Sequence, residues 1–156
     1  MNSFVSQPGR ILVVAGVALL GLVTQSASGQ QPKAEITTYK SPACGCCRGW
    51  VEHMRRAGFV VKSQDVEDIQ VVKTTYGLPL KLASCHTSLA GGYVLEGHIP
   101  AEVVERVLRE RPKVAGLAVP GMPVGSPGME QGSRRDPYDI VAFDKQGKTS
   151  VYESRR

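Results

Sequence analysis

The sequence lacks a run or stripe of basic residues with interleaved aromatic side chains. Its 19 Lys and Arg outnumber its 14 Asp and Glu, but these cations are scattered along the chain. A nucleic-acid-binding protein usually gathers its cations on one face or along one helix, so the sequence argues against a nucleic-acid partner. With 42% apolar and 21% charged residues, the composition indicates a globular chain rather than a disordered one.

Cysteine is scarce as well, with four in 156 residues. That is too few to scaffold a small protein in which several disulfides replace the core. Three of the four lie within Cys44–Cys47, and this clustering indicates a chemical site. The length of the chain favours a single domain.

The N-terminal apolar run is too short to span a bilayer comfortably. The thirteen residues of Ile11–Val23 follow the single charge of Arg10 and precede the small residues Ala27–Gly29. This layout is typical of a secretory signal peptide, although an uncleaved membrane anchor has similar features. We predict a signal peptide over residues 1–29 and a mature domain over residues 30–156. The mature domain would lie in the periplasm, without stable insertion in a membrane.

Alternating and helical patterns of apolar residues predict the order of elements along the mature chain. The predicted elements are a strand (35–40), a helix (44–57), a strand (59–63), a short helix after Asp65, a hairpin (87–90, 93–96), a helix (101–110) and a second hairpin (139–143, 149–153). The short helix is expected to turn Ile69, Val72 and Tyr76 inward. A helix between the first two strands implies a parallel pair, and each hairpin is antiparallel. The fold class is therefore α/β, with a thioredoxin-like mixed sheet flanked by helices, a Gly/Pro/Met loop and a C-terminal β-hairpin.

Cys44-Gly45-Cys46-Cys47, at the start of the predicted helix, carries the strongest chemical signal. Cys44 and Cys47 form C-x-x-C, and the helix N-terminus stabilises a thiolate there. We interpret Cys44 as the attacking thiol and Cys47 as the resolving thiol of a redox pair, with a permanent disulfide as the alternative. Cys46 adds nothing to simple dithiol exchange. Three thiolates within four residues instead suit a soft metal ion.

Cys85 and His86 precede the first predicted hairpin. In a thioredoxin-like order this segment lies beside the C-x-x-C helix start, so both residues are candidate metal ligands. The alternative is a buried structural cysteine followed by a solvent-exposed histidine. His98 is expected to be a surface loop residue, with a role as metal ligand as the alternative, and His53 a partly exposed residue without a chemical role.

The loop from Ala118 to Glu130 contains Met122 and Met129 between glycines and prolines. The prolines exclude both a continuous helix and a central strand. Loops of this length without regular structure are often functional, and thioethers are soft copper ligands. The two methionines are therefore either additional metal ligands or hydrophobic plugs that hold the loop on the core.

Several uncommon strings occur together in this chain and resemble the CopG-type family of small metal-binding proteins, which is associated with copper resistance. The strings are Tyr39–Trp50, Cys85–Thr87, Glu96–Pro100, Gly121–Glu130 and Asp136–Asp139. The resemblance implies a thioredoxin-like fold and periplasmic copper handling, with Cys44, Cys46, Cys47 and Cys85 as the sulfur set. It supports metal binding better than any particular catalysed reaction.

The resulting hypothesis is a periplasmic protein that holds Cu(I) and couples it to thiol or copper redox chemistry in copper tolerance. Other periplasmic copper-handling proteins would be its partners. Adjacent cysteines point about 100° apart around a helix, so Cys46 and Cys47 are expected to serve different ions of a small Cu(I) cluster rather than one zinc ion. The alternatives are a thiol–disulfide oxidoreductase without a metal role and a passive disulfide-stabilised binding module.

Overall fold

Strands and helices follow one another in the predicted order in the computed structural model, which describes residues 33–156. The predicted signal peptide lies outside the described residues. The elements are β1 (Lys33–Lys40), α1 (Gly45–Arg56), β2 (Phe59–Asp65), α2 (Ile69–Thr75), η1 (Leu80–Leu82), β3 (His86–Ala90), β4 (Tyr93–Glu96), α3 (Ala101–Glu110), β5 (Gly116–Ala118), β6 (Tyr138–Phe143) and β7 (Thr149–Arg155). Within this part of the chain, no helix is both long and apolar enough to cross a membrane.

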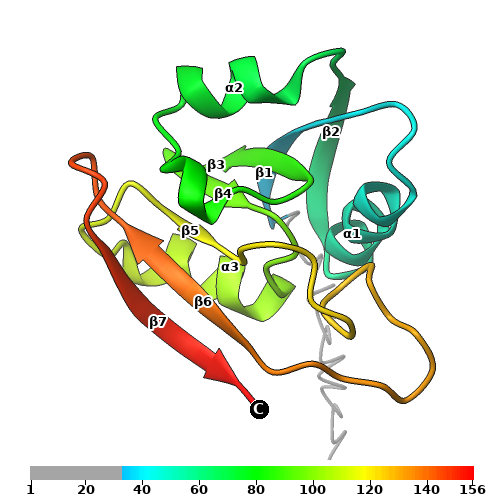
Figure 1. Cartoon of the computed structure of the whole chain (residues 1–156). Helices are drawn as coiled ribbons and strands as arrows, with labels where there is room; N and C mark the ends of the chain where they lie inside the picture. The colour runs from blue at the N-terminus through cyan, green and yellow to red at the C-terminus, as the bar shows by residue number, and fades with distance from the viewer. Residues whose placement is uncertain (1–32) are drawn as a thin grey trace, which may run out of the picture. The chain divides into compact units, whose positions relative to one another are not determined.

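The strands form one seven-stranded mixed sheet in the order β2-β1-β3-β4-β5-β6-β7 (Figure 1). The predicted parallel pair β1–β2 and the antiparallel hairpins β3–β4 and β6–β7 are confirmed. The α/β class with a mixed sheet is therefore confirmed. β5 pairs parallel with β4 and antiparallel with β6. The sequence did not predict it, because three residues are too few to show an alternating pattern.

Helix α1 packs on the sheet through the face that the sequence predicts. Cys47, Trp50, Val51 and Met54 are its buried residues, and they recur at the spacing of one helical face. The indole N–H of Trp50 donates a 2.8 Å hydrogen bond to the carbonyl oxygen of Ile99. This hydrogen bond joins the middle of the helix to the segment that follows β4.

Helix α2 differs from the prediction in its cap and in the side chains that it buries. Asp68, not Asp65, caps it, with its carboxylate accepting the N–H of Gln70. Tyr76 is 37% exposed, so the expectation that it turns inward is wrong. Lys73 is the buried residue of this helix. An apolar pattern cannot reveal a buried lysine, because its burial depends on an ion-pair partner, Glu96, that lies far along the chain.

The loop between β5 and β6, which we call the strap (residues 119–137), passes beside α1 (Figure 1). Gly128 has a φ of +84° and lies so close to α1 that a Cβ would come 2.6 Å from the carbonyl oxygen of Cys46. A left-handed φ with no room for a side chain requires glycine. The strap is thereby packed directly on the backbone of the helix start, and as predicted it contains neither a helix nor a long strand.

Candidate metal centre

The start of α1 brings together the two cysteines of the C-x-x-C pair. Cys44 is the N-cap, and its sulfur accepts a 3.3 Å hydrogen bond from the N–H of Cys47. Cys44 and Cys47 form a disulfide, with their Cα atoms 5.3 Å apart. Cys47 is buried, whereas Cys44 is half-buried. The spacing therefore places the pair within bonding reach, as expected for C-x-x-C at a helix start.

Cys46 and Cys85 are free and complete a group of four sulfurs. The sulfur of Cys46 lies 3.4 Å from that of Cys44 and 3.8 Å from that of Cys85. All four sulfurs lie within 4.8 Å of one another. Cys46 and Cys47 therefore belong to one small group of sulfurs, and their assignment to different ions of a small cluster stays a prediction.

Cys85 is also the centre of a second group, with His86 and His98. Its sulfur lies 2.9 Å from Nε2 of His98 and 3.3 Å from Nδ1 of His86. Nδ1 of His98 lies 2.7 Å from the carbonyl oxygen of Pro127 in the strap. A carbonyl oxygen only accepts, so Nδ1 carries the proton and Nε2 presents its lone pair to the sulfur.

Both histidines are buried, which corrects two readings of the sequence. His98 is not a surface loop residue, and His86 is not solvent-exposed, because both side chains are 0% exposed. The register of the predicted hairpin could have placed His98 beside Cys85. Thr87 pairs with Glu96 in this hairpin. When the same antiparallel register is extended by two residues, Cys85 lies opposite His98.

Burial shifts the pKa of all three members of this second group. It raises the pKa of the Cys85 thiol to about 12, with the neighbouring Cys46 adding to the effect. Burial lowers the pKa of His86, with the charges of His98 and Lys73 acting in the same direction. It also lowers the pKa of His98, although the hydrogen bond to Pro127 opposes this. Both imidazoles are therefore neutral at pH 7, the form that binds metals.

His86 has a further property expected of a ligand. Its Nε2 atom is buried and has no hydrogen-bond partner among the described residues. The ring packs against Trp50 at 4.6 Å between centroids and meets the ring of His98 edge-on at 5.0 Å. Leaving a buried polar atom unpaired costs about 1–3 kcal/mol, and a bound metal ion is one way to recover that free energy.

A buried ion pair fixes the segment that carries Cys85 and His86. The carboxylate of Glu96 pairs with the ammonium of Lys73, and both side chains are 0% exposed. The same carboxylate accepts a 2.6 Å hydrogen bond from the N–H of Ser84 and a 2.7 Å hydrogen bond from the hydroxyl of Thr87. These contacts hold the chain on both sides of Cys85. Sequence reasoning missed Lys73 and Glu96, because each reads alone as an ordinary charged surface residue.

The two methionines belong to the strap and differ in exposure. Met122 is 53% exposed and lines an open cleft with Pro120, Tyr138 and neighbouring residues of the strap and β6. Met129 is half-buried and directly follows Gly128, which contacts α1. Their roles as ligands or as packing residues stay predictions.

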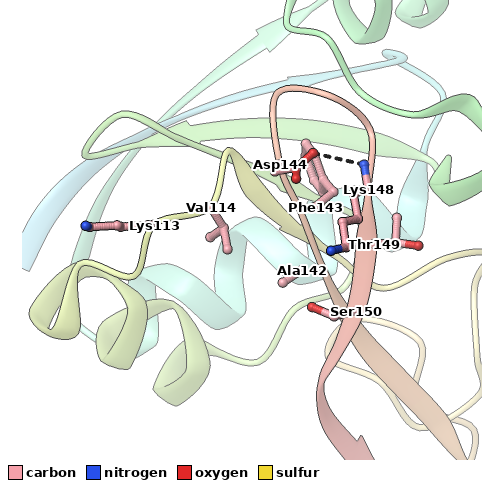
Figure 2. A pocket seen from close by; sticks show the side chains of 8 residues that line it. All are labelled: Lys113, Val114, Ala142, Phe143, Asp144, Lys148, Thr149 and Ser150. Carbon is pink, nitrogen blue, oxygen red and sulfur yellow. Dashed lines mark hydrogen bonds between the residues drawn. The ribbon is translucent and has the colours of Figure 1, made fainter.

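A cavity at the turn of the C-terminal hairpin lies outside this centre. It has a volume of about 240 Å³, and its lining residues are Lys113, Val114, Ala142, Phe143, Asp144, Lys148, Thr149 and Ser150 (Figure 2). The carboxylate of Asp144 accepts the backbone N–H of Lys148 within the turn. The cavity has no cysteine, histidine or methionine in its lining, so it offers a soft metal ion no suitable donor.

Two of three comparisons with known proteins found a match. A family described as "Protein of unknown function, DUF411" matches residues 82–129. No curated protein matches the chain. A solved structure described as copper resistance protein CopG, form 2, is 40% identical, with a TM-score of 0.76 over 81% of this chain and 100% of that one. Form 1 is 41% identical, with a TM-score of 0.74 over 78% of this chain and 96% of that one.

Proposed function

The chain belongs to the CopG family of copper resistance proteins, and from that premise we propose that it binds Cu(I) in the periplasm through Cys44, Cys46, Cys47 and Cys85. One observation carries the proposal, namely that all four sulfurs lie within 4.8 Å of one another. Thiolate sulfur is the donor that Cu(I) prefers.

The choice of copper over zinc rests on the family and on the donor set. Four sulfurs this close together can surround one tetrahedral zinc ion or bridge the ions of a small Cu(I) cluster. His86 and His98 extend the donor set beyond the four ligands that a closed zinc site needs. Cu(I) is also the softer ion and favours thiolate bridges. We therefore expect more than one Cu(I) per chain.

Copper binding is coupled to thiol redox chemistry in this proposal. The Cys44–Cys47 disulfide removes two of the four thiols from the donor set, and reduction restores them. A disulfide sulfur is a poor ligand, because the thiolate is the form that binds metal. The reduced chain is thus the copper-binding form, with His98 beside Cys85 as a nitrogen donor.

In this proposal Cu(I) enters and leaves the centre by way of the strap methionines, Met122 and Met129. Met122 is exposed at the surface, where a copper-handling protein of the periplasm can reach its thioether. We expect a Met122→Leu/Met129→Leu variant to exchange Cu(I) with a chelator more slowly at nearly unchanged melting temperature. Met54→Leu is the matched control, because Met54 is a buried methionine of α1. Unchanged exchange would favour a packing role for the strap methionines.

Anaerobic titration of the reduced chain against a competing Cu(I) chelator tests the central proposal. Stoichiometry above one Cu(I) per chain is expected, and Cys46→Ser or Cys85→Ser should lower it. Serine keeps the approximate size of cysteine but removes the soft donor. A single tightly held Zn(II) with no competitive Cu(I) binding would contradict the proposal. Intact-mass analysis of protein from the periplasm, with a start near Gln30, tests the localisation.

A thiol–disulfide oxidoreductase is the second candidate, favoured by the disulfide at the start of α1. It predicts that Cys44 and Cys47 suffice to reduce a disulfide in a protein substrate. Cys46→Ser and Cys85→Ser would then keep full reductase activity. Loss of activity in either variant would exclude a function limited to the C-x-x-C pair.

A further inference from the structure

The four sulfurs form a connected series that runs from the helix start to the segment before β3. Cys47 is bonded to Cys44, the sulfur of Cys46 lies 3.4 Å from that of Cys44, and the sulfur of Cys85 lies 3.8 Å from that of Cys46. Reacting atoms held about 3–3.5 Å apart are already near the geometry of attack. The sulfur of Cys46 is within this range of Cys44, whereas the sulfur of Cys85 lies slightly beyond it from Cys46.

We propose that the chain is an internal disulfide relay, in which one disulfide moves between the Cys44–Cys47 pair and the Cys46–Cys85 pair. In the first step the thiolate of Cys46 attacks Cys44, which forms a Cys44–Cys46 bond and releases Cys47. In the second, slower step Cys85 loses its proton and attacks Cys46, which forms a Cys46–Cys85 bond and releases Cys44. Each step makes one S–S bond and breaks one, and the released thiolate takes up the proton that the attacking thiol lost.

The relay needs no external oxidant or reductant, because the number of disulfides stays at one throughout. Its two end states differ in which thiols they leave free. The first leaves Cys46 and Cys85 free, as in this structure, whereas the second leaves Cys44 and Cys47 free. The second also joins α1 covalently to the segment before β3. The same oxidation level thus presents two different thiol pairs to a metal or a partner.

The surroundings hold both ends of the relay in place. Gly128 of the strap packs against the backbone at Cys46. On the other side, Glu96 holds Ser84 and Thr87, the residues that flank Cys85 and His86. The sulfurs that the relay joins are thus held 3.4 and 3.8 Å apart.

Trapping with an alkylating reagent tests the relay in the absence of metal. The full mature chain, with the single Cys44–Cys47 disulfide, is treated with N-ethylmaleimide at several concentrations without reductant, and the labelled positions are mapped by mass spectrometry. The relay predicts label on Cys44 and Cys47, with a share that rises as the reagent is diluted and exchange outpaces trapping. Label confined to Cys46 and Cys85 at every concentration would overturn it.

Two variants and a dilution series of the protein test whether the labelling arises from exchange through Cys46 within one molecule. Cys46→Ser removes the middle of the relay, so label on Cys44 and Cys47 should fall to background. The Cys44→Ser/Cys47→Ser variant should form the Cys46–Cys85 disulfide on mild oxidation, and failure to do so would overturn the proposed end state. Dilution of the protein should not change the label pattern, since a concentration dependence would indicate exchange between molecules. No metal is present, so failure of the relay leaves the proposal of copper binding standing.

Discussion

Among the four cysteines, Cys44 lies where a thiolate is most favoured and Cys85 where a thiolate is least favoured. Cys44 receives the N–H of Cys47 at the N-terminus of α1, where the helix dipole favours a thiolate. Burial raises the pKa of Cys85 to about 12, and the neighbouring Cys46 adds to the rise. The fold thus separates the reactivity of two thiols that lie in the same cluster.

We predict that limited alkylation of the fully reduced chain at mildly acidic pH labels Cys44 first and Cys85 last. Cys85 stays protonated because its pKa lies far above the pH of the experiment, and only the thiolate reacts. Peptide mapping at short reaction times measures the order. The unfolded reduced chain is the control, and it should label all four cysteines at similar rates. Equal rates in the folded chain would contradict the assigned environments.

At the scale of elements, the strap depends on one glycine contact with α1. A Cβ at Gly128 would lie 2.6 Å from the backbone N of Trp50, whereas a Cβ at Gly132 meets nothing within 4 Å. Both glycines have positive φ, +84° and +57°. A comparison of the same substitution at the two positions therefore separates the effect of the close contact from that of backbone strain.

We predict that Gly128→Ala lowers the free energy of unfolding by clearly more than Gly132→Ala. Strain at positive φ costs each variant about 1–3 kcal/mol, and Gly128→Ala must also move the strap away from α1. Urea denaturation measures the stabilities. Faster alkylation of Cys46 in Gly128→Ala alone would show that the strap has moved at the centre. Equal losses in the two variants would mean that the contact contributes nothing.

The buried pair of Lys73 and Glu96 joins α2 to the hairpin that carries Cys85. We predict that Lys73→Met costs about 3–5 kcal/mol of stability, because it leaves a buried carboxylate without its counter-charge. Adding Glu96→Gln should restore part of the loss, since the amide oxygen can still accept from the N–H of Ser84 and the amide NH2 can donate to the hydroxyl of Thr87. Denaturant titration of the single and double variants measures this. A double variant less stable than Lys73→Met would argue against an uncompensated charge as the cause.

These elements show how far the sequence determined the site. The helix face of α1 and both hairpins could be predicted, because their patterns are local and regular. Lys73 could not, because its burial depends on a partner far along the chain. The position of His98 could have been predicted, since the register of the predicted hairpin sets it opposite Cys85. The distances among the four sulfurs could not, because they depend on side-chain rotamers rather than on helical periodicity.

At the scale of the whole molecule, the centre connects segments that are distant in sequence. Its donors come from the start of α1, the segment before β3, β3 itself and the segment after β4, and the strap packs beside them. Unfolding would scatter these donors. A metal ion bound by them therefore stabilises the native chain by a free energy that grows with the logarithm of its free concentration over Kd.

We predict that Cu(I) stabilises the reduced chain much more than the chain with the Cys44–Cys47 disulfide. Free Cu(I) at a hundredfold excess over Kd adds about 2.7 kcal/mol of stability, whereas the disulfide form offers only two of the four thiols. Anaerobic thermal unfolding of both forms, with Cu(I) buffered by a chelator, measures the difference in Tm. The reduced Cys46→Ser/Cys85→Ser variant is the control, because it also has two thiols and should respond weakly. Equal shifts in the reduced and disulfide forms would mean that Cys44 and Cys47 do not hold the copper, and the two remaining thiols with the histidines and methionines would then have to supply the site.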